Sequence, residues 1–322
     1  MVVSELGGDT LAACLKTVEE ARLRLHLPTD MIVVNNGGGR SLATVVRETA
    51  PEARLLDLRQ NVGYASAVMS GIDVASGRWI ATVNDDVVLE PDALTRLLAA
   101  GERSPRVGAV GPQIRFSGRR NTLNSTGIEV DRLGVAFDRH VGDPVCVSER
   151  EVTEVFGVSG AAALYRREML RELGGFDTSF FGYLEDVDLA WRARMNGWSA
   201  VYVPTAVAYH RHSLTFTHAS DEKYFLVGRN RVRLLAKNAT ARQLAVYGAP
   251  AVAYDLAYVL FVLVTRRSLA PLHGRLRGLR EWRRYRASAP SPRQSVRLAR
   301  PRGLRAALRR NRSWSGSTGS SG

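Results

Sequence analysis

The feature that most constrains the fold is a regular alternation of strand-like and helix-like segments over residues 1–115. Apolar runs such as Met31–Val34 and Trp79–Val83 have the length of buried strands, and each is followed by a polar turn. The other predicted strands are Val2–Val3, Arg54–Leu58 and Val107–Gly111, and the predicted helices are Thr10–Leu25, Leu42–Glu48, Tyr64–Ala75 and Pro91–Ala100. Alternation at this spacing predicts βαβ units on a mostly parallel sheet, which is an α/β fold.

Residues 116–240 have a mixed pattern. The predicted strands there are Glu151–Val158, Ala161–Tyr165 and Ala200–Val203, the last stopped by Pro204, and the predicted helices are Arg166–Leu173, Leu184–Asn196 and Asp221–Lys237. In open α/β sheets, ligands bind beyond the carboxyl ends of the strands. Polar residues that follow the predicted strands are therefore the candidates for a functional site.

The net positive charge of the chain comes from one stretch near its end. The formal net charge is +14, yet residues 265–312 alone hold sixteen Arg, no Lys and one acid, Glu281, while the remainder has 29 Lys and Arg against 30 Asp and Glu. A neutral body argues against a protein whose core binds duplex nucleic acid. The two cysteines, Cys14 and Cys146, exclude a disulfide framework and fit a reducing compartment.

The apolar segment Leu244–Val264 is long enough to span a bilayer. Asp255 and Pro250 argue against a span, and a single span would place the Arg-rich stretch opposite to the positive-inside tendency. We therefore favour a re-entrant or interfacial segment with the Arg-rich stretch on anionic lipid, and a helix packed on the body is the alternative. The Ser/Gly-rich end, residues 313–322, is predicted to be disordered.

Two acidic clusters are the strongest chemical candidates. Asn84-Asp85-Asp86 follows a predicted strand, and adjacent carboxylates there call for a compensating hard cation shared with a diphosphate, or else form a helix-capping turn. Glu185, Asp186 and Asp188 begin a predicted helix behind several aromatic residues. A helix N-terminus tolerates acids, but an apolar wall can also raise a carboxylate pKa toward that of a usable base.

Three further sites are weaker signals. His210 follows the strand-like segment Val207–Tyr209, and this histidine becomes a metal candidate only if the fold brings it to Asp86. The turn Asn61–Tyr64 lies between a strand and a helix, and the turn Asn35–Gly39 is rich in glycine. Neither turn is a G-x-G-x-x-G or Walker motif, which argues against a dinucleotide-dependent oxidoreductase and against a P-loop NTPase.

Taken in order, these segments resemble the inverting glycosyltransferases of family 2, and most closely the bacterial rhamnosyltransferases. The resemblance spans residues 1–240 and is carried by VVNNGGG (33–39), NVGYASAVMSGI (61–72), NDDV (84–87), VSGAAALYRREMLRELGGFD (158–177), FFGYLEDVDLAWRARMNGW (180–198), AYHRHS (208–213) and RNRVRLLAKN (229–238). It implies a GT-A fold, with a nucleotide-binding half at 1–115 and an acceptor-binding half at 116–240. Residues 241–312 then form a C-terminal helical, membrane-associating segment.

The resemblance also implies a role for each motif. It assigns Mg²⁺ or Mn²⁺ to Asp86 and His210, and catalysis to Asp186 as base with Glu185 beside it. It assigns the nucleotide-sugar to Asn35, Asn61, Gly63, Asn84 and Asp85, and the acceptor to Ser159, Gly160, Asp188 and Trp191, with Asp188 alternatively a structural acid. Asn35 replaces the Asp that the family often uses against the nucleotide base, so the donor base is less constrained.

The resemblance implies a partner and a location as well. The expected donor is dTDP-rhamnose, with other dTDP- or UDP-sugars open, and the expected acceptor is a lipid-linked or cell-wall glycan at the cytoplasmic face of the membrane. No nucleic acid is expected. Two alternatives remain at this point: a sugar-phosphate nucleotidyltransferase, which normally has a basic glycine-rich loop near its first strand, and a non-enzymatic nucleic-acid-binding protein that uses the Arg-rich stretch.

Overall fold

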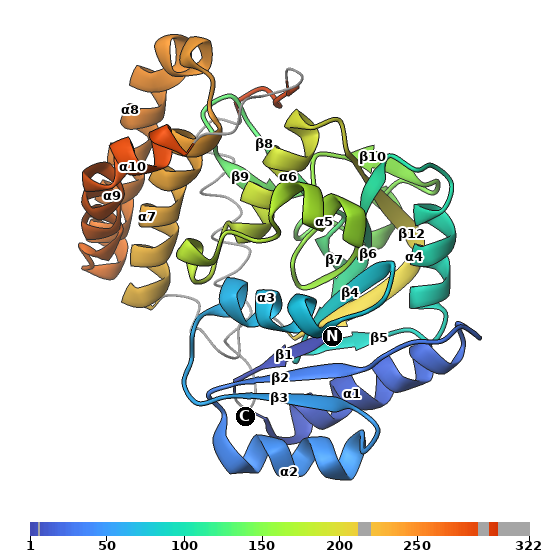
Figure 1. The fold of residues 1–322 in the computed structure, drawn as a ribbon. Coiled ribbons are helices and arrows are strands. Elements are labelled where there is room, and N and C mark those ends of the chain that lie inside the picture. Colours follow the sequence, from blue (N-terminus) through green and yellow to red (C-terminus); the bar gives the residue numbers. More distant parts are fainter. Residues whose placement is uncertain (6, 212–219, 289–295, 302–322) are drawn as a thin grey trace.

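A mixed sheet with helices on both faces forms the centre of the protein (Figure 1). The computed structural model describes residues 1–5, 7–211, 220–288 and 296–301, and within these ranges the sheet has ten strands. The order along the sheet is β10 (Thr153–Val155), β12 (Ser199–His210), β6 (Val107–Phe116), β11 (Ala162–Arg166), β4 (Trp79–Asn84), β1 (Val2–Ser4), β2 (Ile32–Asn36) and β3 (Arg54–Leu58). Two more strands, β5 (Val87–Leu89) and β7 (Arg119–Ser125), pair with β12 and β6, respectively.

Parallel and antiparallel pairing divide the sheet into two parts. Strands β3, β2, β1 and β4 are parallel to one another, as the βαβ pattern predicts. Beyond them β11 runs antiparallel to both β4 and β6, while β6 and β12 are again parallel. A separate hairpin of β8 (Ile128–Val130) and β9 (Ala136–Asp138) lies outside this sheet. The fold is of the predicted α/β class, and its sheet is more mixed in the second half of the chain than in the first.

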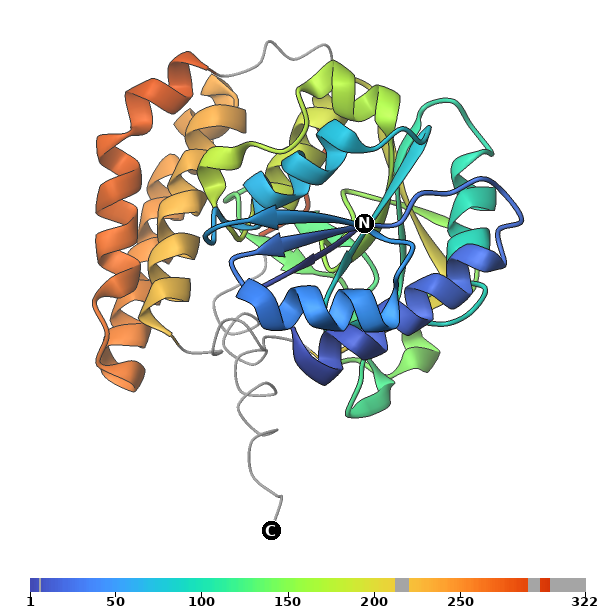
Figure 2. The same cartoon turned by 60° about the horizontal axis from the view of Figure 1, so that its bottom comes forward.

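Helices cover the two faces of the sheet because successive strand residues point in opposite directions. Val2 and Val33 pack with α1 (Gly8–Leu23) and α2 (Gly39–Thr49), whereas Val3 and Val34 pack with α3 (Tyr64–Val74). Figure 2 shows α1 and α2 on one face of these strands and α3 on the other. The remaining helices of the body are α4 (Ala93–Gly101), α5 (Arg167–Leu173), α6 (Glu185–Met195) and two short 3₁₀ turns, η1 (Val145–Val147) and η2 (Thr178–Phe180). The core therefore consists of two apolar layers that hold the strand ends in fixed register.

The largest difference from the sequence prediction concerns β12. Pro204 does not stop this strand, which continues to His210. The pairing register between β12 and β6 shifts between Val203 and Val207, so Pro204 lies in an irregular stretch where a missing N–H costs little. This continuation matters because it carries His210 to the edge of the sheet where the acidic turn lies.

Four helices follow the body and lie together at one side of it (Figure 1): α7 (Asp221–Asn238), α8 (Ala241–Arg266), α9 (Ala270–Arg280) and α10 (Trp282–Ala287). Asp255 of α8 accepts hydrogen bonds from Arg231 of α7 and Arg275 of α9, each at 2.7 Å. Arg233 of α7 pairs with Glu281. The acid that argued against a membrane span is thus an anchor that fixes α8 to its neighbours.

Helix α8 is neither fully buried nor detached. By length and composition it could cross a membrane. Ala251, Val259 and Val262 are buried, whereas Val252, Leu256 and Leu260 are each about 60% exposed. The predicted disordered end, residues 313–322, lies outside the described residues, as do residues 302–312 of the Arg-rich stretch.

Candidate active site

A cavity of about 350 Å³ opens at the carboxyl ends of β1, β2 and β4. It is lined by ten of the residues that the sequence analysis singled out: Asn61, Gly63, Asn84, Asp85, Asp86, Ser159, Gly160, Glu185, Asp186 and His210. Their segments are far apart in the chain, and the sheet order brings them to one place. The predicted donor half and the predicted acceptor half both contribute walls.

Strand pairing brings Asp86 to His210. Strand β5 begins directly after the acidic turn and pairs antiparallel with the end of β12, with Val87 opposite His210. The backbone N–H of Arg211 donates to the Asp86 carbonyl at 2.9 Å. His210 Nε2 then lies 3.1 Å from Asp86 Oδ1, and both side chains are buried.

This pair has the chemistry and spacing of two ligands for a divalent ion. Two neighbouring ligands of an octahedral ion with bonds of about 2.1 Å lie about 3.0 Å apart, close to the observed separation. Nearby, the buried Oδ1 of Asn84 has no hydrogen-bond partner within the described part of the chain. The described residues contain no group of three or more His, Cys, Asp or Glu side chains that could hold a metal. A pair of ligands fits an ion that also takes oxygens from a bound diphosphate better than an ion fully caged by protein.

Asp85 differs in its surroundings from Asp86. Its Oδ2 accepts a hydrogen bond from Ser4 Oγ at 2.5 Å, which ties the acidic turn to the end of β1. Burial raises the pKa of Asp85 to about 6, although the Ser4 hydroxyl opposes that rise. A cation or a donor group entering the cavity would stabilise its charged form.

Glu185 and Asp186 begin α6 side by side at the cavity wall, with different partners. Asp186 Oδ2 accepts from the Gly160 N–H at 2.9 Å, and its Oδ1 accepts from the Val187 N–H at 2.8 Å. Glu185 Oε2 is buried without a hydrogen-bond partner among the described residues. Burial raises the pKa of Asp186 and, with the added repulsion of Asp186, raises that of Glu185 to about 8. The pair therefore combines one oriented carboxylate with one that holds its proton near neutral pH.

The loop in front of these acids is strained and held by α7. Phe181, Tyr183 and Leu184 all have positive φ angles, of 66°, 67° and 68°, which non-glycine residues rarely adopt. Asn230 is fully buried, and its Nδ2 lies 2.8–2.9 Å from the carbonyl oxygens of Phe180, Gly182 and Tyr183. The hydrogen bonds from Asn230 thus hold the backbone that aims Glu185 and Asp186 into the cavity.

The loop that contains Phe181 also requires a glycine at position 63. The φ of Gly63 is 84°, and a Cβ there would lie 2.5 Å from the Phe181 carbonyl oxygen and from the Phe181 ring. The next residue, Tyr64, donates its hydroxyl to the Gly160 carbonyl at 2.9 Å. The start of α3 therefore contacts both segments that position Asp186.

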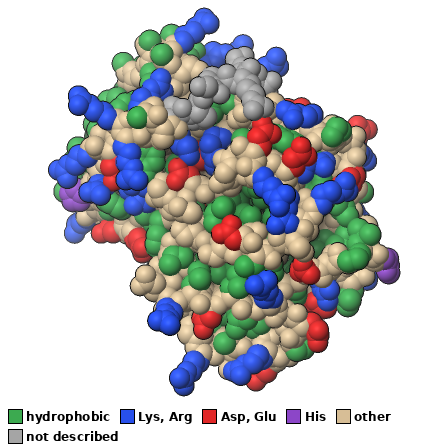
Figure 3. Space-filling view, in the orientation of Figure 1, with side chains coloured by type: hydrophobic (Ala, Val, Ile, Leu, Met, Phe, Trp, Pro, Cys, Tyr) green, Lys and Arg blue, Asp and Glu red, His purple; other side chains and the backbone are tan. Residues whose placement is uncertain are grey.

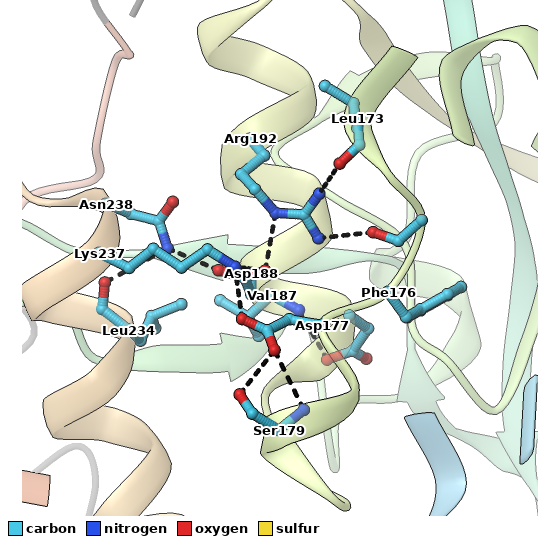
Figure 4. Close-up of polar contacts among 12 residues, drawn as sticks. Leu173, Phe176, Asp177, Ser179, Val187, Asp188, Arg192, Leu234, Lys237 and Asn238 are labelled. Carbon is cyan, nitrogen blue, oxygen red and sulfur yellow. Dashed lines mark hydrogen bonds and ion pairs between the residues drawn. The ribbon is translucent and has the colours of Figure 1, made fainter. Parts of the chain in front are cut away.

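Two of the predicted acceptor residues are not at the cavity. Asp188 is fully buried and accepts hydrogen bonds from Arg192, Lys237 and Asn238, as Figure 4 shows. Trp191 is 1% exposed and packs edge-to-face on Phe156. Both follow Asp186 on α6, and the helical turn points them into the protein. Neither side chain lines the cavity in this structure, and the hydrogen bonds of Asp188 fit its structural alternative.

The predicted nucleotide contact of Asn35 is also not supported. Its Oδ1 accepts from the Gly38 N–H at 2.8 Å, and its Nδ2 donates to Asp57 and to the Gly39 carbonyl. The side chain is fully buried and lies outside the cavity lining, because these bonds fold it into the turn after β2. The following residue, Asn36, lines the cavity instead.

Two residues at or beside the cavity carried no sequence signal. Asn124 on β7 contacts His210, and Lys223 at the start of α7 lines the cavity with its ammonium 5.4 Å from the Tyr183 ring centre. Burial lowers the pKa of Lys223 to about 8. Single Asn and Lys residues outside a motif are common, so only the folded structure reveals their proximity to the site.

A half-parallel sheet whose strand ends present an acidic turn and a buried carboxylate pair to one cavity is the arrangement of a GT-A glycosyltransferase. Comparison with known proteins leads to the same class. The chain belongs to glycosyltransferase family 2: the sequence model described as "Glycosyltransferase like family 2" matches residues 8–235. It is therefore an enzyme of the hexosyltransferase type.

Among characterised relatives, the chain is 33% identical over 209 residues to the N-acetylglucosaminyl-diphospho-decaprenol L-rhamnosyltransferase of Mycobacterium tuberculosis. That alignment covers 58% of this chain and 68% of the relative. The poly-beta-1,6-N-acetyl-D-glucosamine synthase of Staphylococcus epidermidis is 24% identical, over 64% of this chain and 47% of its own length. The family resemblance and the rhamnosyltransferase likeness expected from the motifs are confirmed.

Solved structures confirm the GT-A fold. The mannosyltransferase of Pyrobaculum calidifontis, in complex with GDP-Man and Mn²⁺, superposes with a TM-score of 0.53 at 18% identity, covering 86% of this chain and 85% of that one. TarS of S. aureus superposes with a TM-score of 0.56 at 13% identity, covering 89% and 82%. At these identities the likeness concerns the fold alone.

Proposed function

We propose that this enzyme moves L-rhamnose from dTDP-rhamnose to a hydroxyl of a lipid-linked or cell-wall glycan, with inversion at the anomeric carbon. The observation that supports it most is the meeting of Asp86, His210 and Asp186 at one cavity in a chain that is 33% identical to a rhamnosyltransferase. That relative's name includes a diphospho-decaprenol acceptor, which suggests the acceptor class here. UDP-sugars remain the second donor class.

The two alternative functions, a sugar-phosphate nucleotidyltransferase and a nucleic-acid-binding protein, fit these observations less well. The segment before the first helix lacks the basic glycine-rich loop of a sugar-phosphate nucleotidyltransferase, and the family match covers residues 8–235 of the catalytic body. A nucleic-acid-binding protein would leave both acidic clusters at the cavity without a role. We keep residues 1–240 as the catalytic body, with the donor bound mainly by 1–115 and the acceptor mainly by 116–240.

Asp86 and His210 would hold Mg²⁺ or Mn²⁺ in this proposal, with Asn84 and Asp85 close to the diphosphate. When bound, the ion offsets the negative charge that develops on the nucleoside diphosphate leaving group. Asn61, Gly63, Ser159 and Gly160 all line the cavity. In this proposal Asn61 and Gly63 would contact the donor, and Ser159 and Gly160 the acceptor. The strained loop and α7 keep this geometry fixed before the substrates bind.

Asp186 acts as the base. It takes the proton of the acceptor hydroxyl while that oxygen attacks the anomeric carbon, and the bond from this carbon to the diphosphate oxygen breaks with its electron pair leaving on the diphosphate. One displacement inverts the configuration, so one carboxylate base suffices, unlike the pair used in hydrolysis. The hydrogen bonds from Gly160 and Val187 orient its two oxygens.

The test uses the full chain with dTDP-rhamnose and a short-chain N-acetylglucosaminyl-diphospho-polyprenol, with product followed by mass spectrometry. We expect transfer with Mn²⁺ or Mg²⁺, and loss of transfer in Asp186→Asn and Asp86→Ala with unchanged melting curves. Full transfer by either variant would overturn the assigned roles. Transfer only from UDP-sugars would overturn the rhamnose donor.

We further propose that the enzyme works at the cytoplasmic face of the membrane, docked through α8. Val252, Leu256 and Leu260 form an exposed apolar face, while Asp255 is turned to the neighbouring helices α7 and α9. The exposed Arg266 and Arg267 close the helix, and Lys and Arg side chains gather over α7–α10 (Figure 3). An apolar face bordered by Arg matches an anionic lipid surface.

Vesicle flotation tests this docking. The full chain should float with phosphatidylglycerol vesicles, less with phosphatidylcholine, and Leu256→Glu with Leu260→Glu should abolish flotation. Leu23→Glu is the matched control, because Leu23 is equally exposed, at 61%, on the distant helix α1. Flotation unchanged by the α8 pair would overturn the proposal, and so would a dimer in solution that the same pair disrupts.

A further inference from the structure

The two ring nitrogens of His210 have different partners. Nε2 faces Asp86 Oδ1 at 3.1 Å, and Nδ1 lies 2.9 Å from Asn124 Oδ1. An amide oxygen only accepts hydrogen bonds, so the nitrogen that faces it carries a proton. Nε2 is then the nitrogen whose lone pair can bind a cation beside Asp86.

Asn124 reaches His210 because of an irregularity in β7. Strand β7 pairs with β6 as Ser125 opposite Ile114 and Leu123 opposite Arg115, so Asn124 is the extra residue of a β-bulge. Strand β12, which carries His210, pairs with the same end of β6. Bulges re-aim a side chain that a regular strand would point elsewhere, and here the re-aimed amide is buried against the imidazole.

We propose that Asn124 is a positioning residue of the metal site: by accepting the Nδ1–H of His210, it fixes the tautomer and ring orientation that present Nε2 to the ion at Asp86. This inference depends on the metal site of the proposed function. It adds a residue from a segment that none of the recognised motifs includes. Hydrogen-bond partners behind a ligating histidine typically change metal affinity about 10–100-fold when they are removed.

The test measures Mn²⁺ binding rather than turnover. The full chain is titrated with Mn²⁺ in the presence of saturating dTDP, and the free ion is counted by electron paramagnetic resonance. Asn124→Leu removes the acceptor while keeping a branched side chain with the same number of heavy atoms, and we expect about 10-fold or greater weakening of Mn²⁺ binding. Asn124→Asp keeps an acceptor oxygen, and we expect affinity equal to the wild type or tighter.

Asn121→Leu is the matched control, since Asn121 is exposed on the same strand and should leave the affinity unchanged. Melting curves and metal-free dTDP binding should be alike in all four proteins. Wild-type affinity in Asn124→Leu would overturn the inference, and so would equal weakening in Asn124→Asp, which would indicate a packing defect. If the wild type itself bound no Mn²⁺, the proposed metal site would fail first, and this outcome is distinct from the other two.

Discussion

Replacing Asp188 by Ala should lower the free energy of unfolding and leave the KM for the acceptor unchanged. Asp188 is fully buried and accepts hydrogen bonds from Arg192 at 2.8 Å, Lys237 at 3.0 Å and Asn238 at 2.8 Å (Figure 4). Removing one partner of a buried ion pair costs about 3–5 kcal/mol because a charge is left uncompensated.

The remaining partners set the expected value within that range. Lys237 keeps its 2.7 Å pair with Asp177, and Arg192 keeps hydrogen bonds to two backbone carbonyls at 2.8 Å. The loss should therefore lie near the lower end, about 3 kcal/mol. At about 2 °C per kcal/mol for a chain larger than 250 residues, the melting temperature should fall by about 6 °C.

Differential scanning calorimetry of Asp188→Ala measures this shift directly. Glu154→Ala is the control, because it also removes an acid paired with an arginine of α6, but Glu154 is 60% exposed and such pairs contribute below about 1 kcal/mol. A melting temperature within 1 °C of the wild type (about 0.5 kcal/mol), combined with a raised KM for the acceptor, would refute the buried-anchor reasoning and restore Asp188 as an acceptor residue.

Three shorter predictions follow from the site. Gly63→Ala should lower the melting temperature and the rate, because its Cβ would meet Phe181; Gly8→Ala, with a similar φ of 71° and open space, should cost less. The pKa of Glu185 is about 8 in the folded protein and 4.5 in the unfolded chain, so the free energy of unfolding falls as the pH rises from about 4.5 to 8. The melting temperature of Glu185→Gln should fall less over this pH range than that of the wild type. Melting temperatures that fall equally in the two proteins would contradict a buried, protonated Glu185. Asp86→Ala should abolish the Mn²⁺-dependent part of thermal stabilisation by dTDP, and retention of that part would remove Asp86 from the metal site.

The architecture of the first half could be predicted from local sequence patterns. Apolar runs of strand length alternating with helical periodicity can be buried only as a parallel sheet between helices, and strands such as Arg54–Leu58 are found with the predicted bounds. The acidic turn at the end of β4 and the acids at the start of α6 were also predictable, because local sequence decides where a strand or helix ends. The family motifs then indicated the activity.

The packing of whole elements determines which of these residues contact one another. Periodicity could not show that Asp188 faces inward while Asp186 faces the cavity, because that depends on how α6 packs against α7. The sequence also gave no sign of Asn124, whose contact with His210 spans 86 residues and needs a bulge. The same holds for Asp255: alone it argues only against burial in lipid, whereas its partners Arg231 and Arg275 become visible once three helices are packed. Side-chain partners at long sequence separation depend on the packing of whole elements, which no local pattern records.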